Sequence, residues 1–206
     1  MTNNVSPHTL RIAVDFDGFL LPTYEQKTKW YRENYDPFLP PFNPEDWTDH
    51  SMVTLWGGEQ DTLGPLYDTT RDTYTALPIP GSLAAMRALQ RDASRPELFL
   101  LSSGYDWQRV LKDKWVNDHE FPIQRSVYME QGQTKADVCR LEGATCILED
   151  RYDYALNCAT SGTPAILLQR YTWSRGPEHE LIYKIDDHNG VLDAYHAILG
   201  LKLSHT

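Results

Sequence analysis

Short apolar runs alternate along this chain with longer segments in which apolar residues recur at helical spacing. The apolar runs, each about the length of one strand, are 11–15, 97–101, 125–129, 144–148, 164–168 and 181–185. The helical patterns begin near Ser82 and at about 105–117, 135–141, 152–160 and 190–199. Strands that alternate with helices in this way predict an α/β fold, with a Rossmann-like parallel sheet and helices on both faces.

The helical pattern at 105–117 also predicts which side of that helix is buried. Its larger apolar residues are Trp107, Val110, Leu111 and Trp115. Because they recur at helical spacing, we expect them to form the packing face against the sheet.

The segment 22–77 interrupts the alternation. It is rich in proline, tryptophan and tyrosine, and its prolines prevent one long regular element, although helical patterns occur at 24–35 and 66–76. We interpret this segment as a small, mainly helical cap inserted after the first strand. Residues 1–21 and 78–206 would then form the core domain.

Three of the expected strands end in polar side chains that can carry chemistry. The residues at these ends are Asp15 and Asp17, Ser102 and Ser103, and Glu149 and Asp150. Parallel strands present their carboxyl ends at one edge of a sheet, so we expect the three groups to meet there. An isolated Asp-Phe-Asp-Gly stretch could be only a polar turn. Two like charges so close together otherwise call for a cation or a shared proton.

Composition narrows the classes of partner. The chain has 206 residues, 41% of them hydrophobic, and a formal net charge of −10. This is typical of a globular protein, and the negative charge disfavours tight binding of polymeric nucleic acid. A small anionic substrate needs only a few cations in a pocket, so phosphate esters remain compatible with it.

Cysteine usage and the N-terminus bear on the compartment. Cys139, Cys146 and Cys158 form an odd set without CxxC spacing, which favours reduced, buried thiols. No signal-peptide pattern opens the sequence, and no window is long and apolar enough to span a bilayer. We therefore expect a cytoplasmic protein without a membrane partner.

Taken together, the polar strand ends resemble the four motifs of the haloacid dehalogenase (HAD) superfamily of phosphatases. Asp15-Phe-Asp17-Gly is similar to the first motif, Ser102 after its apolar strand to the second, and Lys135 at a helix start to the third. Glu149-Asp150 is similar to the acidic fourth motif. The resemblance covers about 11–21 and 78–170.

The resemblance implies a role for each position. Asp15 would be the nucleophile that forms an aspartyl-phosphate, and Asp17 would be the general acid and base. Ser102 would bind the phosphoryl oxygens, and Lys135 would bind the same oxygens and hold the nucleophile. Mg²⁺ would lie between Asp15, the backbone carbonyl of Asp17 and an acidic residue of the fourth motif.

The fourth motif departs from the commoner pair of aspartates, so its metal ligand is open. We favour Asp150, with Glu149 behind it and Asp153 as an alternative. Asp17 narrows the choice of reaction within the superfamily. The resemblance implies that a carboxylate at this position shuttles protons, which favours hydrolysis of phosphate esters.

Within the superfamily, the insertion after the first motif, Pro80-Gly81 and Ser102-Ser103 resemble the 5′(3′)-deoxyribonucleotidase group. Glu149-Asp150-Arg151 is also similar to the phosphatase half of polynucleotide kinase-phosphatases, which act on 3′-phosphates. Both imply a nucleotide-type ester as the substrate, and a sugar phosphate is the alternative.

Residues next to the motifs complete the expected substrate contacts. Ser103 and Gly104 follow Ser102, and Trp47 and Trp56 are the cap aromatics best placed to stack on a base, unless they are only the core of the cap. An alternative hypothesis from another functional class is a catalytically silent protein that binds a nucleotide or a partner protein in the same cleft. Phosphoryl transfer to an acceptor other than water is a third.

Overall fold

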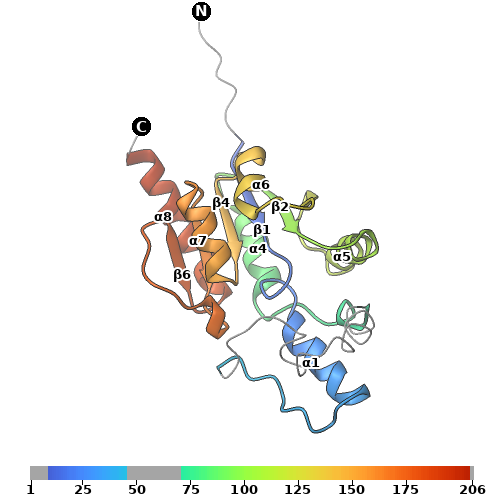
Figure 1. Ribbon diagram of the computed structural model, residues 1–206. Coiled ribbons are helices and arrows are strands. Elements are labelled where there is room, and N and C mark those ends of the chain that lie inside the picture. Colours follow the sequence, from blue (N-terminus) through green and yellow to red (C-terminus); the bar gives the residue numbers. More distant parts are fainter. Residues whose placement is uncertain (1–8, 46–70, 205–206) are drawn as a thin grey trace, which may run out of the picture.

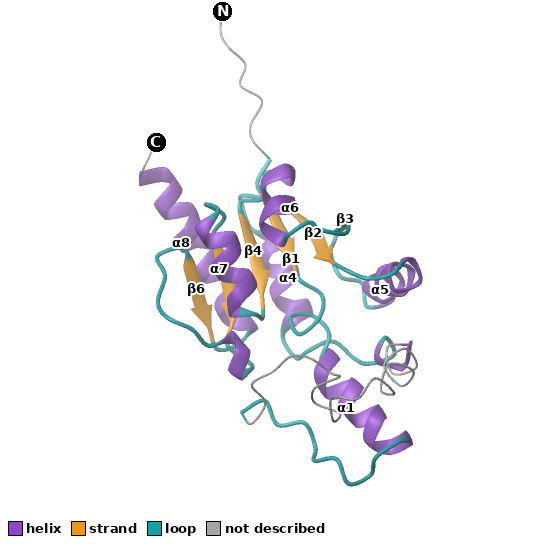
Figure 2. Ribbon diagram, viewed as in Figure 1, coloured by secondary structure: helices purple, strands orange, loops and turns teal. Residues whose placement is uncertain are grey.

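The computed structural model describes residues 9–45 and 71–204, and a six-stranded sheet lies at its centre (Figures 1 and 2). The strands are β1 (Arg11–Val14), β2 (Glu97–Ser102), β3 (Arg125–Tyr128), β4 (Cys146–Glu149), β5 (Ala165–Leu168) and β6 (Ile182–Ile185). Their order is β3-β2-β1-β4-β5-β6, and every pairing is parallel. The expected parallel α/β sheet is confirmed.

Helices cover both faces of this sheet. They are α4 (Ser82–Arg91), α5 (Asp106–Asp118), α6 (Lys135–Glu142), α7 (Tyr152–Thr160) and α8 (Val191–Ser204). Side chains of α4, α5 and α8 pack on one face, where Ile12 and Val14 of β1 point, whereas α6 and α7 pack on the other, where Ala13 points. Successive strand residues point to opposite faces, which is why strands buried on both sides read as continuous apolar runs.

The packing face of α5 agrees with the expected one at Trp115, which is buried, but not at Val110. Val110 is 67% exposed, whereas the buried residues of the helix are Lys112, Trp115 and Val116. A prediction from apolar residues alone passes over a lysine, although Lys112 lies one helical turn before Trp115 on the same side. The buried face of α5 therefore includes a charged residue that needs partners inside the protein.

The chain leaves the sheet after β1 and enters α1 (Thr23–Asn34), which lies apart from the sheet in Figure 1. Ionic and aromatic contacts join α1 to the segment after β5. Arg170 forms an ion pair with Glu25 at 2.8 Å, and the ring of Tyr171 packs edge-on against Tyr24. These contacts place α1 beside the carboxyl ends of the strands. The cap boundaries at 22 and 77 stay a prediction.

At the amino-terminal ends of the strands, Glu97 at the start of β2 links β2 to the strands on both sides of it. Its carboxylate accepts hydrogen bonds from Arg11 of β1 at 3.1 Å and from Arg125 of β3 at 2.6 Å. Arg125 also pairs with Glu142 at the end of α6. The hydrogen bond from Arg125 is the main cause that lowers the pKa of Glu97, against a smaller opposing effect of burial.

We expect Glu97→Gln to lower the free energy of unfolding by about 1 kcal/mol at pH 7, because solvent screens this partly exposed network. The folded pKa is depressed, so the stabilisation is present above the unfolded pKa of about 4.3 and is lost as pH falls through the folded value. Denaturant unfolding of wild type and Glu97→Gln at pH 7 and pH 3 measures this difference in unfolding free energy. Glu120→Gln, in an exposed pair with Arg87, is the control and should be neutral. A loss at pH 3 as large as at pH 7 would contradict the assignment.

Two further expectations concern the cysteines and membrane-spanning helices. Cys139, Cys146 and Cys158 are buried and are not in disulfide bonds, as expected for reduced thiols. Among the helices of the described ranges, none combines the length and the apolar character that a bilayer crossing requires.

Candidate active site

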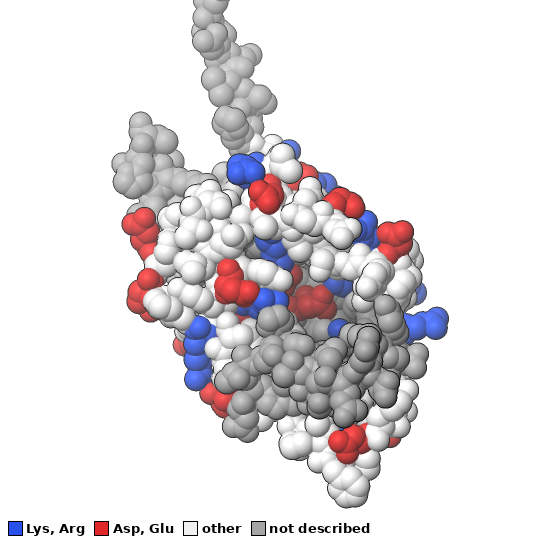
Figure 3. Space-filling model, viewed as in Figure 1, with Lys and Arg blue, Asp and Glu red and all other residues white. Residues whose placement is uncertain are grey.

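The carboxyl ends of β1, β2 and β4 meet at the middle of one sheet edge. Asp15 directly follows β1, Ser102 ends β2, and Glu149 ends β4. The strand order changes direction between β1 and β4, and ligands of open α/β sheets bind at such a switch point. Figure 3 shows acidic and basic side chains gathered in a hollow on this side of the molecule.

A pocket of about 200 Å³ opens at this point. It is lined by Asp15, Asp17, Thr23, Tyr24, Lys27, Ser102, Ser103, Met129, Lys135, Arg151 and Tyr154. Five sequence-predicted residues are thus brought together at the pocket wall, namely Asp15, Asp17, Ser102, Ser103 and Lys135. Trp47 and Trp56 lie outside the described residues, and Gly104 is not part of the pocket wall.

Lys135 is the first residue of α6, and its position is fixed by the cap of that helix. The hydroxyl of Thr134 accepts a hydrogen bond from the backbone of Asp137, and the Asp137 carboxylate accepts one in return. Lys135 Nζ lies 2.6 Å from Asp15 Oδ1 and 2.5 Å from Glu149 Oε2. Burial acts to lower the pKa of Lys135, but these two carboxylates outweigh it and raise the pKa, so Lys135 stays charged.

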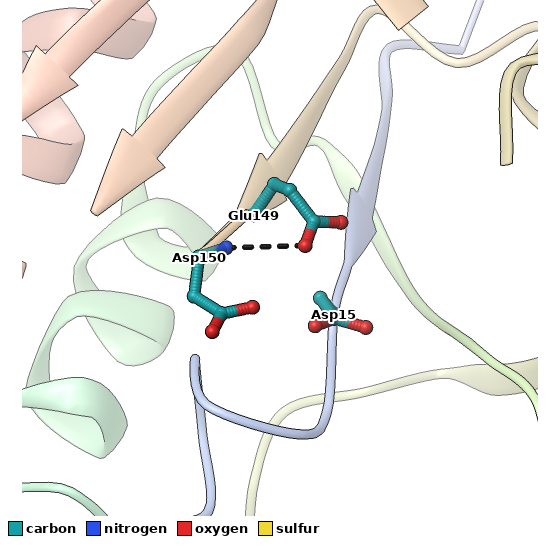
Figure 4. A group of neighbouring side chains, drawn as sticks. All are labelled: Asp15, Glu149 and Asp150. Carbon is teal, nitrogen blue, oxygen red and sulfur yellow. Dashed lines mark hydrogen bonds between the residues drawn. The ribbon is translucent and has the colours of Figure 1, made fainter. Parts of the chain in front are cut away.

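Asp15, Glu149 and Asp150 form a buried acidic cluster (Figure 4), in which one oxygen from each residue lies within 4.8 Å of the others. Both Glu149 oxygens have partners, because Oε2 pairs with Lys135 and Oε1 accepts from the backbone N–H groups of Asp150 and Arg151. Among the described residues, Asp150 Oδ1 is buried without a hydrogen-bond partner. Burial, followed by repulsion from Glu149 and Asp15, raises the pKa of Asp150 well above its usual range.

This donor set fits a hard divalent cation such as Mg²⁺. The unpartnered Asp150 oxygen and the nearby Asp15 carboxylate are oxygen ligands, and a cation between them would relieve their repulsion. Gly18 leaves room for the Asp150 carboxylate, because a Cβ at position 18 would lie only 2.2 Å from Asp150 Oδ2. The φ of +83° at this position also favours glycine. Asp153, the alternative ligand, is exposed and pairs with Arg151 outside the cluster.

Asp17 lies on the other side of the pocket and has its own partners. Its Oδ2 accepts from Lys112 Nζ at 2.6 Å, and its Oδ1 accepts from the Thr23 hydroxyl at 2.7 Å. Burial acts to raise the pKa of Asp17, but Lys112, Lys27 and these hydrogen bonds outweigh it and lower the pKa to about 2. The carboxylate is therefore ionised in this arrangement.

Ser102 presents its hydroxyl beside Asp17. Its Oγ accepts a hydrogen bond from Lys112 Nζ at 2.7 Å, and the only acceptor recorded for its own O–H within the described ranges is the Ser103 carbonyl at 3.4 Å. That contact is long for a hydroxyl donor. Ser102 can therefore turn its hydrogen toward an oxygen in the pocket.

Sequence reasoning missed several residues that line the pocket or contact its wall. Lys112 contacts Asp17 and Ser102 of the wall but is not part of the apolar pattern of its helix. Thr23 and Lys27 line the pocket from α1, whose position relative to the strand ends no local pattern reveals. Arg151 directly precedes α7 and Tyr154 lies in its first turn, and the Arg151 guanidinium stacks on the Tyr154 ring at 3.8 Å from its centroid. Their position directly after Glu149-Asp150 was the available signal.

Comparison with solved structures defines the fold. A haloacid dehalogenase-like family hydrolase from Xanthomonas campestris is 12% identical, with a TM-score of 0.60 over 92% of this chain and 96% of its own. The HAD-hydrolase YfnB from Bacillus subtilis, which was solved bound to magnesium, is 14% identical, with a TM-score of 0.60 over 93% and 99%. A putative β-phosphoglucomutase from Thermotoga maritima is 12% identical, with a TM-score of 0.61 over 92% and 99%.

The chain thus has the fold of haloacid dehalogenase-like hydrolases, and the expected fold class is confirmed. Protein-family models and curated proteins give no match to the sequence. At such low identity the likeness shows the fold alone, and a fold by itself does not determine a function.

Proposed function

We propose that this protein is a Mg²⁺-dependent phosphomonoester hydrolase that acts through an aspartyl-phosphate. The observation that supports it most is the division of the aspartates between two environments. Asp15 lies within the acidic cluster and against Lys135, whereas Asp17, two positions later, is held apart by Lys112 and Thr23. This division supports Asp15 as the group that attacks phosphorus and Asp17 as the group that transfers protons.

In the first step, an Asp15 carboxylate oxygen attacks phosphorus and the bond from phosphorus to the leaving oxygen breaks. Lys135 and the Ser102 hydroxyl bind the phosphoryl oxygens, and Asp17 gives a proton to the leaving oxygen. The phosphoryl dianion brought next to Asp17 raises the pKa of that carboxyl, which favours its protonation. In the second step, Asp17 takes a proton from water as the water attacks phosphorus, and phosphate leaves with Asp15 restored.

Asp15 and Asp150 would hold Mg²⁺, together with the backbone carbonyl of Asp17. The bound cation would supply charge neutralisation for the phosphoryl oxygens. Glu149 would act through Lys135, since both of its oxygens already have partners. Lys135 in turn would keep Asp15 in place between attack and hydrolysis.

For the substrate we propose a nucleoside monophosphate, on the resemblance of the motifs to nucleotidases. The pocket of about 200 Å³ is smaller than the roughly 300–1,000 Å³ of usual ligand sites, so it takes the phosphoryl end and the nucleoside would extend beyond it. The test is phosphate release from nucleoside 5′- and 3′-monophosphates and sugar phosphates with Mg²⁺. A preference for sugar phosphates would change the proposed substrate class to sugar phosphates. Binding of the esters without turnover of any of them would overturn the proposed hydrolase activity.

Lys27 supports an anionic substrate. It lines the pocket from α1, and within the described residues no ion pair or hydrogen bond neutralises it. Burial is the main cause that lowers its pKa, with Lys112 acting in the same direction and Asp17 opposing. An incoming phosphate ester would give this cation a counter-charge.

We expect Lys27→Met to reduce kcat/KM for phosphate esters about tenfold or more, because a hydrogen bond to a charged group contributes about 1.5–3 kcal/mol. Steady-state kinetics measures it, with Lys29→Met on the exposed side of the same helix as the matched control. Equal kinetics for both variants would remove Lys27 from the substrate site.

A further inference from the structure

Lys112 is a buried lysine that touches two parts of the site without reaching the pocket itself. It is 2% exposed, and it is absent from the pocket wall that Asp17, Ser102 and Ser103 help to form. Its ammonium lies 2.6 Å from Asp17 Oδ2, 2.7 Å from Ser102 Oγ and 3.0 Å from the Ser103 carbonyl. The Phe16 ring lies beside the same nitrogen, with its centroid at 5.0 Å.

The hydrogen-bond count limits what this lysine can do. An ammonium group has three N–H donors and no acceptor, and Lys112 has three acceptors in contact. It therefore has no donor left for a substrate unless it gives up one of these partners. Its contacts instead join the loop after β1 to the end of β2, two segments with separate roles in the proposed reaction.

Each contact also orients its partner. Lys112 can only donate, so Ser102 Oγ accepts from it and the serine hydrogen points elsewhere, which makes Ser102 a donor toward the pocket. Asp17 is held at both oxygens, by Lys112 and by Thr23. One cation thus fixes the direction of a phosphoryl-binding hydroxyl and of the proton-transferring carboxylate.

A purely structural role explains these observations less well. A buried lysine costs desolvation free energy, and an apolar residue of similar volume is often as stable or more stable at such a site. Met, Leu or Val at position 112 would extend the apolar face formed by Trp115 and Val116. The lysine is instead directed at two pocket residues.

We propose that Lys112 is a positioning residue, which holds Asp17 and Ser102 in a fixed relative arrangement for proton transfer and phosphoryl binding. The inference rests on the proposed phosphatase function. It differs from the roles implied by the four motifs, because Lys112 lies on α5, outside all of them.

The test compares Lys112→Met with Lys114→Met on two substrates. Lys114 lies on the exposed side of the same helix, where it pairs with Asp118, and is the matched control. One substrate is an alkyl phosphate, whose poor leaving group needs protonation, and the other is an activated aryl phosphate, whose leaving group does not. Circular dichroism and thermal unfolding check that each variant is folded.

We expect Lys112→Met to lower kcat on the alkyl phosphate by roughly 10²-fold, the lower end of what general acid–base catalysis contributes, and on the aryl phosphate by much less. KM should rise for both esters, because Ser102 loses its orientation. Lys114→Met should leave both esters unchanged. In an Asp17→Asn background, Lys112→Met should add little further loss of kcat on the alkyl phosphate, because the partner through which it acts is gone.

An equal loss of kcat on both esters, or an undiminished effect in the Asp17→Asn background, would overturn the positioning role. If Lys112→Met does not fold, Lys112→Gln, which keeps one donor group, should show the same selectivity between esters. Failure of both variants to fold would assign Lys112 to the core and also overturn the proposal. A folded wild-type protein inactive on every ester would instead refute the phosphatase function, so the two failures are distinguishable.

Discussion

Asp15→Asn is expected to abolish turnover on every phosphate ester. The substitution keeps the size of the side chain but removes the anionic oxygen that attacks phosphorus, so no phosphoenzyme can form. The amide should fit the same place at the end of β1, where the Asp15 backbone N–H donates to the Leu148 carbonyl at 3.0 Å. Burial raises the pKa of the Asp15 carboxyl despite its contact with Lys135, which means that its charge is unfavourable in the folded protein, so removing this charge should not destabilise the fold.

The decisive measurement is capture of the phosphoenzyme. Wild-type protein mixed with an activated aryl phosphate and quenched in acid should carry one phosphoryl group by mass spectrometry, and Asp15→Asn should carry none. Asp17→Asn is the matched variant, since it also exchanges an aspartate for an amide but keeps the nucleophile. It should retain phosphorylation by the aryl phosphate and accumulate the intermediate, because its second step lacks a base.

Two results would contradict the mechanism. Substantial turnover by folded Asp15→Asn would favour an activated water as the nucleophile at the same site. A phosphoryl group found on a residue other than Asp15 would assign the nucleophile elsewhere. Magnesium binding must be measured for both variants, because Asp15 is also an expected metal ligand.

The sheet could be predicted because its signals are local. Each strand of a parallel sheet is buried on both faces, so Ile147 and Leu148 read as part of a short apolar run without knowledge of any partner strand. Helix ends were also local, as at Lys135, where Thr134 and Asp137 form a capping box, and at Gly143, which has a φ of +65°.

The acidic cluster could be predicted for a related reason. Asp15 and Glu149-Asp150 stand directly after buried runs, and the rule that parallel strands end at one edge brings them together. The sequence favoured Asp150 over Glu149 as metal ligand but left the choice open, because the choice depends on which carboxylate oxygen Lys135 contacts. The structure places Lys135 on Glu149 and leaves Asp150 Oδ1 without a partner among the described residues.

Lys112 and Lys27 could not be predicted because their chemistry depends on tertiary packing. Lys112 lies on the buried side of α5 beside Trp115, but the hydrophobic pattern marks only apolar positions and included the exposed Val110, so it gave no signal for a buried lysine. Lys27 reaches the pocket only because α1 packs beside the strand ends, through contacts such as Glu25 with Arg170, which are distant in sequence. Side chains that act through another element need the fold before they can be recognised.

Metal removal is the second change with a large expected effect. EDTA should stop turnover and added Mg²⁺ should restore it, because Asp15 and Asp150 otherwise confront the substrate's phosphoryl group with uncompensated negative charge. Asp150→Asn should weaken Mg²⁺ affinity at least about 100-fold, since even the loss of an outer partner of a metal ligand costs about 10–100-fold. Isothermal calorimetry measures this affinity without any dependence on turnover.

Although Asp150→Asn should weaken Mg²⁺ binding, it should stabilise the metal-free protein. Burial and repulsion raise the pKa of Asp150, which means that its ionised form is less favourable in the folded state than in the unfolded state at neutral pH. Asp150→Asn should therefore raise the Tm of metal-free protein, whereas Mg²⁺ should raise the Tm of the wild type and have little effect on the variant. Asp153→Asn, at the exposed alternative ligand, is the control and should keep wild-type Mg²⁺ affinity. Full activity in EDTA, or loss of Mg²⁺ binding in Asp153→Asn but not in Asp150→Asn, would contradict this metal site.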